Sequence, residues 1–475
     1  MISTNLLLLI IIPLLGSIFT ITAKSGHIDA SKNAYNVAAW TLMANIGVIF
    51  SLYLQLDPDK NGIQLVEKYQ WLHLPQIDIF LGVDMFSMLL LTTLGLSFLM
   101  ICLCQEEKDQ KAKAIATSIL LFVSMLNGYI LAADIMSFYI FFAAINIPLI
   151  MLISFSEKTH KKIILIRFRL YNLTGILLLF LAVMTIYDYK GGNIPLNTAG
   201  NLNLSGKKEY FVWISLCLAF MSRLPIWPFH YWIASMNASL HNAMVFVISN
   251  LMPLVGLYGF MRFWPNSVPK TIAVYAPYFE IICLITMLLI AVISLSSKES
   301  RYKLFAYTTV YYILYLIGVF LPTGSLKMNI GVSLFSYIMI FTVISIILGH
   351  IEQEKKRLNL HTLTSMLCYM PRATICLSLY ILAGIGLPIT PLFWNNFIII
   401  SEIFNNNLLL GILVVMSVFL VGLSLLEELY RLKDRAQISS ELKLLQDLSR
   451  KNFIIYIAGI VCLLIILLKS LWMEV

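Results

Sequence analysis

Five ionisable residues inside or beside long apolar stretches are the candidates for chemistry in this 475-residue chain. They are Asp84, Arg223, His230, Glu280 and Glu402. A charged group is expensive to bury in apolar surroundings, so each of these residues marks a candidate site of proton or ion movement.

Arg223 stands immediately before Leu224-Pro225 and is either part of a path for protons or ions or a structural counter-charge. An arginine stays protonated up to about pH 12, so it cannot load and release a proton as a buried lysine can. It can instead act as a structural counter-charge that holds the chain around the prolines. His230 follows a few residues later. It either shuttles protons near neutral pH or sits at the membrane surface against headgroups.

The three acidic candidates differ in their settings. Glu402 follows a second proline-rich segment and is the deeper of them, while Glu280 lies within the apolar range 271–295. Asp84 comes near the start of the range 80–103, where the alternative role is that of a helix cap.

Two proline-rich segments interrupt the apolar stretches that carry these residues. They read Leu224-Pro225-Ile226-Trp227-Pro228 and Leu387-Pro388-Ile389-Thr390-Pro391. Each proline removes a backbone donor, so a carbonyl one turn earlier must find another partner inside the protein or in a wet cavity. Two interrupted spans five apart predict inverted repeats, as in transporters. The alternative is that prolines are simply common in membrane helices.

Composition sets the class of protein. Hydrophobic residues make up 60% of the chain and charged residues 12%, which excludes a soluble globular domain, a disordered chain and a disulfide scaffold. We predict an all-α polytopic membrane protein of about 14 transmembrane helices, two of them broken by proline. The expected spans are 4–22, 38–56, 80–103, 112–131, 133–155, 163–187, 209–235, 239–263, 271–295, 303–321, 328–350, 374–404, 408–429 and 452–470.

The distribution of Lys and Arg predicts the orientation. Connections after odd-numbered spans, counted with the adjoining span ends, carry 22 of the 33 Lys and Arg residues, and those after even-numbered spans, with the C-terminus, carry 9. Arg223 and Arg372, inside or bordering spans, complete the 33. Since the basic side is cytoplasmic, both termini are expected on the other side. The first apolar run has no basic region before it, so it is interpreted as a span rather than a signal peptide. The expected segments are 1–110 (three helices), 111–265 and 266–430 (one repeat each), and 431–475.

The last segment includes a polar connection, 427–451, in which Leu442, Leu444, Leu445 and Leu448 alternate with charges. This spacing predicts an amphipathic helix on the membrane surface or against a partner. Elsewhere the chain has no Gly-rich nucleotide loop, no cysteine cluster and no paired histidines typical of haem. We therefore expect no cofactor or metal on this chain and no nucleic-acid partner, only the lipid bilayer and other membrane subunits.

The motifs together resemble the antiporter-like membrane subunits of respiratory complex I, from about residue 75 to residue 405. Phe80-Leu81-Gly82-Val83-Asp84 is similar to the opening of that family's third span, and Arg223-Leu224-Pro225 with Pro228-Phe229-His230 to its seventh-span break. Further similarities are Asp134 to Phe138 with Ile147-Pro148, Tyr258 to Phe263, Ala306 to Val310, and Gly386-Leu387-Pro388. Among its branches the M-type chain fits best, with the D-type component of multisubunit sodium/proton antiporters close behind.

The departures from the family pattern fall on its proton carriers. The resemblance places the fifth-span glutamate at Ala143 and the seventh-span lysine at Arg223. The other carriers of the family fall on Asn237, Leu254, Tyr312, Tyr337 and Asn396. A Glu–Lys pair relays protons because each charge tunes the other's pKa, so these replacements imply a weakened or absent path.

Three function classes stay open. The first is a membrane-arm subunit of a proton-translocating NADH:quinone oxidoreductase, whose quinone, FMN and iron–sulfur centres would lie on partner subunits. The second is a D-type component of a multisubunit monovalent cation/proton antiporter, with Glu402 or Glu280 as candidate cation ligand. The third is a non-transporting scaffold or assembly protein. A bacterial inner membrane is the expected location.

Overall fold

The computed structural model of this chain describes most of its length. The described residues are 5–22, 29–58, 60, 62–72, 77–104, 111–155, 161–190, 192–196, 207–239, 243–267, 276–321, 326–357, 369–433 and 445–473.

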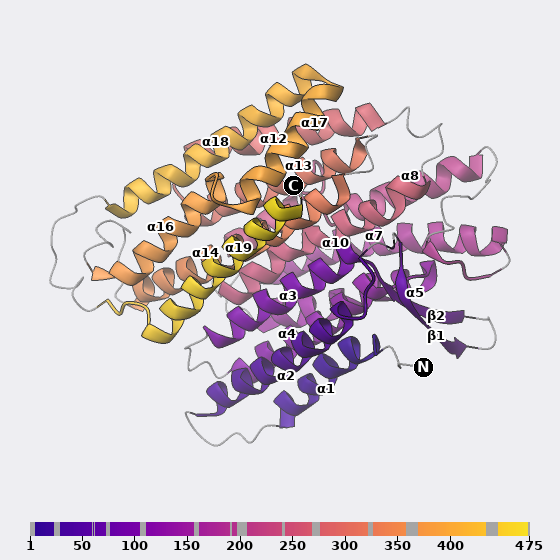
Figure 1. Ribbon diagram of the computed structural model, residues 1–475, viewed down its shortest axis with the longest axis horizontal. Helices are drawn as coiled ribbons and strands as arrows, with labels where there is room; N and C mark the ends of the chain where they lie inside the picture. Colours follow the sequence, from indigo (N-terminus) through magenta and orange to yellow (C-terminus); the bar gives the residue numbers. More distant parts are fainter. Residues whose placement is uncertain are drawn as a thin grey trace. The chain divides into compact units, whose positions relative to one another are not determined.

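Helices make up nearly all of the regular structure (Figure 1). They are α1 (Leu8–Thr22), α2 (Asp29–Tyr53), α3 (Met85–Leu103), α4 (Ala112–Leu131), α5 (Ile135–Ala144), α6 (Asn146–Phe155), α7 (Lys161–Lys190), α8 (Lys207–Met221), α9 (Tyr231–Ser239), α10 (Ala243–Ser267), α12 (Ala276–Ser296), α13 (Ser300–Phe320), α14 (Leu326–Arg357), α16 (Pro371–Ile385), α17 (Pro391–Asn406), α18 (Leu408–Lys433) and α19 (Arg450–Met473).

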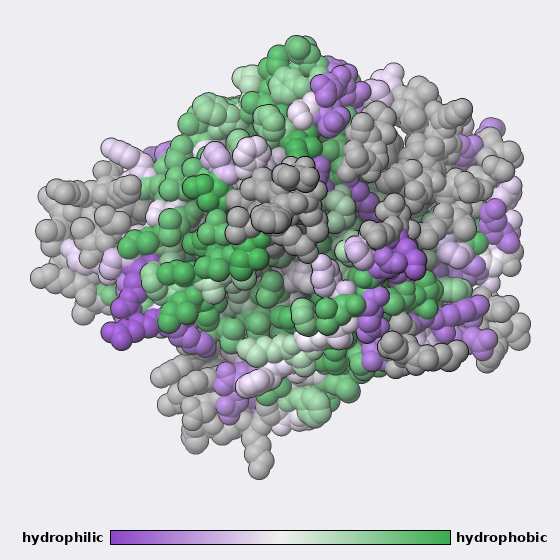
Figure 2. All heavy atoms as spheres, viewed as in Figure 1, coloured by the Kyte–Doolittle hydropathy of each residue, from purple (hydrophilic) through white to green (hydrophobic). Residues whose placement is uncertain are grey.

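Nine helical segments within the described ranges are long and apolar enough to cross a bilayer by themselves. Several of them expose large hydrophobic side chains. On α18, for example, Leu408, Met416 and Phe419 are more than half exposed, and Figure 2 shows hydrophobic residues along this helix. A helix that exposes so much apolar surface is stable in lipid rather than in water. The chain is a multi-pass membrane protein.

The chain divides into two compact units. The first comprises Met1–Ser235 and Met252–Ile282, and the second comprises Met236–Leu251 and Cys283–Val475. In the first unit α1 packs against α2 and α4, and α2 also packs against α3 (Figure 1). In the second unit α14 packs against α16 and α17, and α18 contacts α13, α16 and α17. The predicted segments 1–110, 111–265, 266–430 and 431–475 stay a prediction.

Both proline-rich segments interrupt a helix. Between α8 and α9 the chain forms turns over residues 222–230, and between α16 and α17 it leaves the helix at Gly386. Gly386 has a φ of 100°, a left-handed conformation that favours glycine. A third break separates α5 from α6 at Ile145, three residues before Pro148, and the sequence reasoning missed it.

The all-α prediction is wrong between α2 and α3. Strands β1 (Gln64–Leu72) and β2 (Ile77–Val83) pair as an antiparallel hairpin, so α3 begins at Met85 rather than at residue 80. Residues 77–83 are apolar enough to resemble the start of a span. They are a strand because they pair with β1 and because Leu81 bridges to Ala132 after α4.

The predicted amphipathic helix within 427–451 is also wrong where the chain is described. Residues 427–433 continue α18, residues 445–449 are not helical, and residues 434–444 lie outside the described ranges. Asp447 accepts hydrogen bonds from the backbone N–H groups of Arg372 and Ala373, at 3.0 and 3.1 Å. This short segment therefore caps the start of α16, and its buried Leu445 and Leu448 point away from solvent.

Candidate functional site

Arg223 lies in the first turn after α8 and is completely buried. Because Pro225 cannot donate a backbone hydrogen bond, the chain tightens here: the N–H of Arg223 donates to the carbonyl of Phe220, and that of Leu224 to the carbonyl of Met221. Gly256 of α10 packs against this turn. A Cβ at Gly256 would come within 2.6 Å of the Phe220 carbonyl oxygen, so only glycine allows the approach.

The guanidinium of Arg223 is held by the break between α5 and α6. Nη1 donates to Oδ1 of Asn146 at 2.8 Å, and Nη2 donates to the carbonyl of Phe142 at 3.1 Å. The guanidinium carbon also lies 4.4 Å from the centre of the Phe142 ring, a cation–π contact. Two broken helices thus meet around one cation.

All of these partners are neutral. Within the described residues no carboxylate pairs with Arg223, and its Nε has no hydrogen-bond partner. Phe142 and Asn146 flank Ala143, the position where the resemblance places a glutamate. Neither an arginine nor an asparagine changes its protonation near neutral pH, so these contacts hold a charged guanidinium among neutral groups.

Asp84 takes both the role of a cap and that of an ion-pair partner. Its carboxylate accepts from the N–H of Ser87 at 2.8 Å, which caps α3. It also accepts two hydrogen bonds from Arg262 of α10, at 2.7 and 3.2 Å. Sequence reasoning found the cap but missed Arg262, although the motif Tyr258 to Phe263 contains it.

Two tyrosines link these two arginine sites. Tyr129 of α4 donates to the carbonyl of Val255 on α10, and Tyr258 of α10 donates to the carbonyl of Ile130 on α4. The Tyr129 ring lies 5.4 Å from that of Tyr258 and 6.0 Å from that of Phe142. The Tyr258 hydroxyl in turn accepts from Nε of Arg262 at 2.7 Å. The core of the first unit therefore holds a continuous layer of aromatic and cationic groups.

The other three predicted residues lie apart from this layer. His230 ends the turns after α8; it is half-buried, and its Nδ1 has no hydrogen-bond partner among the described residues. Glu280 is in the second turn of α12, on the buried side with Cys283 and Met287, and forms no ion pair within the described ranges. Glu402 is half-buried in α17, in the second unit. The proton-path roles of all five predicted residues stay predictions.

A cluster of tyrosines forms the core of the second unit. Four of them, Tyr307, Tyr311, Tyr312 and Tyr315, lie on α13, and Tyr337 lies on α14. The Tyr337 ring is 5.3 Å from that of Tyr312 and 5.4 Å from that of Tyr307.

The hydroxyls of this cluster fall into two groups. Those of Tyr307 and Tyr311 donate to the carbonyl of Gly384, just before the break after α16. Those of Tyr312, Tyr315 and Tyr337 make no well-formed hydrogen bond within the described residues, but Tyr315 lies beside Ser333 and Asn396, and Tyr337 lies beside Thr308. Two of the second group, Tyr312 and Tyr337, occupy positions where the resemblance places histidines.

A buried lysine, which sequence reasoning also missed, opens α13. Nζ of Lys303 lies 2.8 Å from a carboxylate oxygen of Glu427 and 3.7 Å from one of Glu428, both near the end of α18. The Lys303 side chain is 1% exposed. The signal in the sequence is a lysine at the start of one apolar range and two acids at the end of another, but nothing in it pairs these ranges.

Comparison with known proteins decides the family. A sequence profile described as "NADH:quinone oxidoreductase/Mrp antiporter, TM" matches residues 132–423, which include both proline breaks, Arg223 and the tyrosine cluster. This chain belongs to that family. The resemblance drawn from the sequence motifs is thereby confirmed.

Named relatives align with nearly all of the chain. NADH-quinone oxidoreductase subunit M of Rickettsia prowazekii is 25% identical over 474 residues, which cover 96% of this chain and 93% of the relative. NADH-ubiquinone oxidoreductase chain 4 of Marchantia polymorpha is 23% identical over 423 residues, which cover 88% and 84%.

Solved structures share the fold at lower identity. A chain of respiratory complex I from Thermus thermophilus superposes with a TM-score of 0.81 at 18% identity, over 97% of this chain and 94% of that one. A chain of the Mrp complex from Dietzia superposes with a TM-score of 0.80 at 13% identity, over 98% of this chain but 50% of that one. The family fold is thus present over essentially the whole chain.

Proposed function

We propose that this protein is the M-like membrane-arm subunit of a proton-translocating NADH:quinone oxidoreductase, with a degenerate proton path. The names of its relatives support the first part, because subunit M and chain 4 of such oxidoreductases align over most of their length with this chain. The second part rests on one observation: the buried Arg223 has only neutral partners among the described residues.

The expected architecture is about 14 transmembrane helices, with two inverted five-helix repeats. The break between α8 and α9, at residues 222–230 of the first unit, and the break between α16 and α17 in the second support this repeat. Each break carries the same pattern of two prolines three residues apart, at Pro225 and Pro228 and at Pro388 and Pro391.

The second unit supports a degenerate path as well. A proton relay near neutral pH needs groups that change protonation there, such as histidine or a tuned lysine. The tyrosine cluster of this unit presents the hydroxyls of Tyr312, Tyr315 and Tyr337 and the amide of Asn396 instead, and the buried Lys303 is ion-paired with Glu427 at the start of α13. A neutral tyrosine or amide donates and accepts hydrogen bonds but does not hold a net proton at pH 7.

The redox chemistry belongs to partners in this proposal. Quinone, FMN and iron–sulfur centres would bind other subunits, as expected from a sequence without a cysteine cluster or paired histidines typical of haem. A bacterial inner membrane, with both termini on the non-cytoplasmic side, is the location that we propose.

Co-purification tests the assembly. The chain is tagged in its own membrane and isolated in mild detergent, and NADH:quinone activity of the isolated material is measured. An NADH-oxidising complex supports the proposal. Isolation with antiporter subunits would instead support the D-type antiporter alternative, and isolation without either would support a scaffold.

Proton movement tests the degenerate path. The complex is reconstituted into vesicles, and acidification per NADH oxidised is followed with a pH-sensitive dye. We expect Arg223→Ala to leave this ratio unchanged, because the arginine stays protonated and does not pass protons on. A lower ratio in Arg223→Ala than in wild type, at equal NADH oxidation, would overturn this part of the proposal.

A gain-of-function variant makes the same test sharper. Ala143→Glu with Arg223→Lys restores a carboxylate beside an amine at the break between α5 and α6. The expected result is an added pH dependence of proton movement near neutrality, which neither single variant shows. Arg223→Lys alone is the matched control, since it changes the cation without adding the acid.

A further inference from the structure

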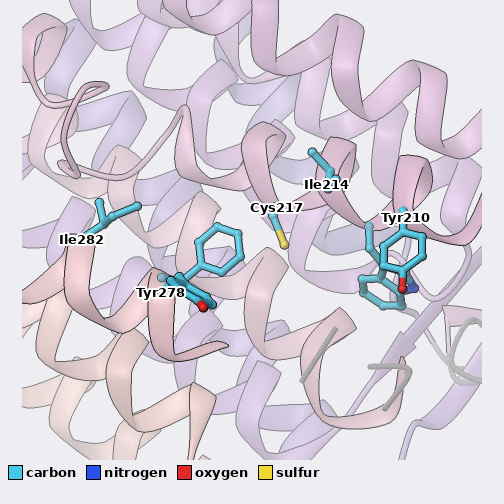
Figure 3. A pocket seen from close by; sticks show the side chains of 7 residues that line it. Tyr210, Ile214, Cys217, Tyr278 and Ile282 are labelled. Atoms are coloured by element: carbon cyan, nitrogen blue, oxygen red, sulfur yellow. The ribbon is translucent and has the colours of Figure 1, made fainter. Parts of the chain in front are cut away.

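An apolar groove lies on the surface of the first unit, between the first turns of α8 and of α12. Tyr210, Trp213, Ile214 and Cys217 line it from α8, and Tyr278 and Ile282 line it from α12 (Figure 3). Its volume is about 440 Å³. Trp213 and Cys217 are buried and form the floor, while Ile214 and Tyr278 are more than half exposed at the rim.

The groove lies near the starts of both helices. The α8 residues lie within the first three turns of that helix, and the α12 residues lie within the first two turns of theirs. Tyrosine and tryptophan gather at the membrane interface because their rings are apolar and their polar ends reach water. Two tyrosines and a tryptophan in one groove fit a position just below the headgroups.

Lys207 lies at the start of α8, next to the groove residues of that helix. Lys207, Tyr210, Ile214 and Cys217 follow one another at helical spacing, so they share one face of α8. Lys207 is exposed, and helical side chains lean toward the N-terminus, which directs its ammonium away from the apolar floor toward the headgroups. Glu209 lies two residues on, on a different face of the helix.

We propose that this groove binds an anionic phospholipid, with an acyl chain along Trp213, Ile214 and Cys217 and the phosphate at Lys207. A free phosphate would not use the apolar floor, and a neutral lipid would not use the lysine. An anionic lipid uses both, and interfacial lysines attract such lipids.

Mass spectrometry of the intact protein tests this proposal. The full chain is placed in nanodiscs of equal phosphatidylglycerol and phosphatidylcholine, and the lipids that stay bound after release are counted. We expect phosphatidylglycerol to exceed phosphatidylcholine about fivefold, the ratio that one interfacial lysine provides. Lys207→Gln should reduce the ratio to about one, whereas Lys208→Gln, a neighbour off the groove face, should preserve most of the preference.

A second pair of variants tests the groove itself. Ile214→Trp fills it and should release the retained lipid, whereas Ile285→Trp, at a similarly exposed site of α12 outside the groove, should not. Equal retention of both lipids in wild type, or retention that Ile214→Trp leaves unchanged, would overturn the proposal. So would a helix of a partner subunit seated in the groove of the assembled complex. The readout is lipid retention and does not depend on proton translocation.

Discussion

Arg262 donates to both carboxylate oxygens of Asp84 and so joins α10 to the residue that caps α3. The two side chains are 7% and 11% exposed. A carboxylate that loads a proton must first release its cation, and here two hydrogen bonds oppose that release. The pair therefore acts as a brace within the first unit, and we expect its loss to affect stability before it affects transport.

Asp84→Asn should lower the free energy of unfolding by about 3–5 kcal/mol, because it leaves the buried guanidinium of Arg262 without a counter-charge. Asparagine caps helices as well as aspartate does, so the capping of α3 is retained and the loss reports on the ion pair. Equilibrium unfolding in mixed detergent and dodecyl sulfate micelles measures the difference.

Asp78→Asn is the matched control for that measurement. Asp78 pairs with Lys68 at 3.1 Å in the hairpin, but the lysine side chain is 54% exposed. A pair open to solvent contributes about 0–1 kcal/mol. If Asp84→Asn cost no more than Asp78→Asn, the brace would be refuted.

Asn146→Leu tests the neutral environment of Arg223. The amide oxygen of Asn146 accepts from the guanidinium, and a hydrogen bond to a charged group contributes about 1.5–3 kcal/mol. We expect a loss of stability of that size by the same unfolding assay. Asn172→Leu is the comparison, because Asn172 is equally buried but bonds within its own helix, to the carbonyl of Phe168. Equal losses would show that Asn146 has no special relation to Arg223.

Much of the helical framework could be predicted from the sequence. The expected span 112–131 coincides with α4, and both double-proline segments interrupt helices. These features are local: an apolar stretch of this length is stable as a helix in lipid, and a proline disrupts the helix where it stands.

The features that sequence reasoning missed depend on contacts between distant residues. The carboxylate of Glu67 in β1 accepts from the N–H groups of Leu6 and Leu7, some 60 positions earlier, and so stabilises the start of α1. Arg262 finds Asp84 across 178 positions. Apolar periodicity says which residues are buried but not which polar groups meet, so the partners could not be predicted.

The tyrosine cluster allows a comparison of hydroxyl groups within one core. Tyr311→Phe removes a hydroxyl that donates to the carbonyl of Gly384 at 3.0 Å, so we expect a loss of about 1 kcal/mol. Tyr312→Phe removes a hydroxyl without a hydrogen-bond partner among the described residues. This change should be neutral or stabilising, because it removes a buried polar group that gains nothing in the fold. Unfolding of the two variants under one condition measures the contrast, and a loss above about 1 kcal/mol for Tyr312→Phe would contradict it.

Lys303 offers a prediction about which of two acids depends on it. Glu427 is 38% exposed and also pairs with Arg431. Glu428 is 5% exposed; besides its ion pair with Lys303, it accepts a hydrogen bond from the hydroxyl of Ser300. Lys303→Met should therefore harm the protein mainly by leaving Glu428 buried without a cation, at a cost of about 3–5 kcal/mol.

A second substitution identifies the dependent acid. Glu428→Gln, added to Lys303→Met, removes the uncompensated charge and should restore most of the lost stability. Glu427→Gln in the same background should restore little, because Arg431 and solvent already stabilise that carboxylate. The interaction energies come from two double-mutant cycles measured by unfolding. A larger rescue by Glu427→Gln would mean that the shorter contact, at 2.8 Å, outweighs burial in this cluster.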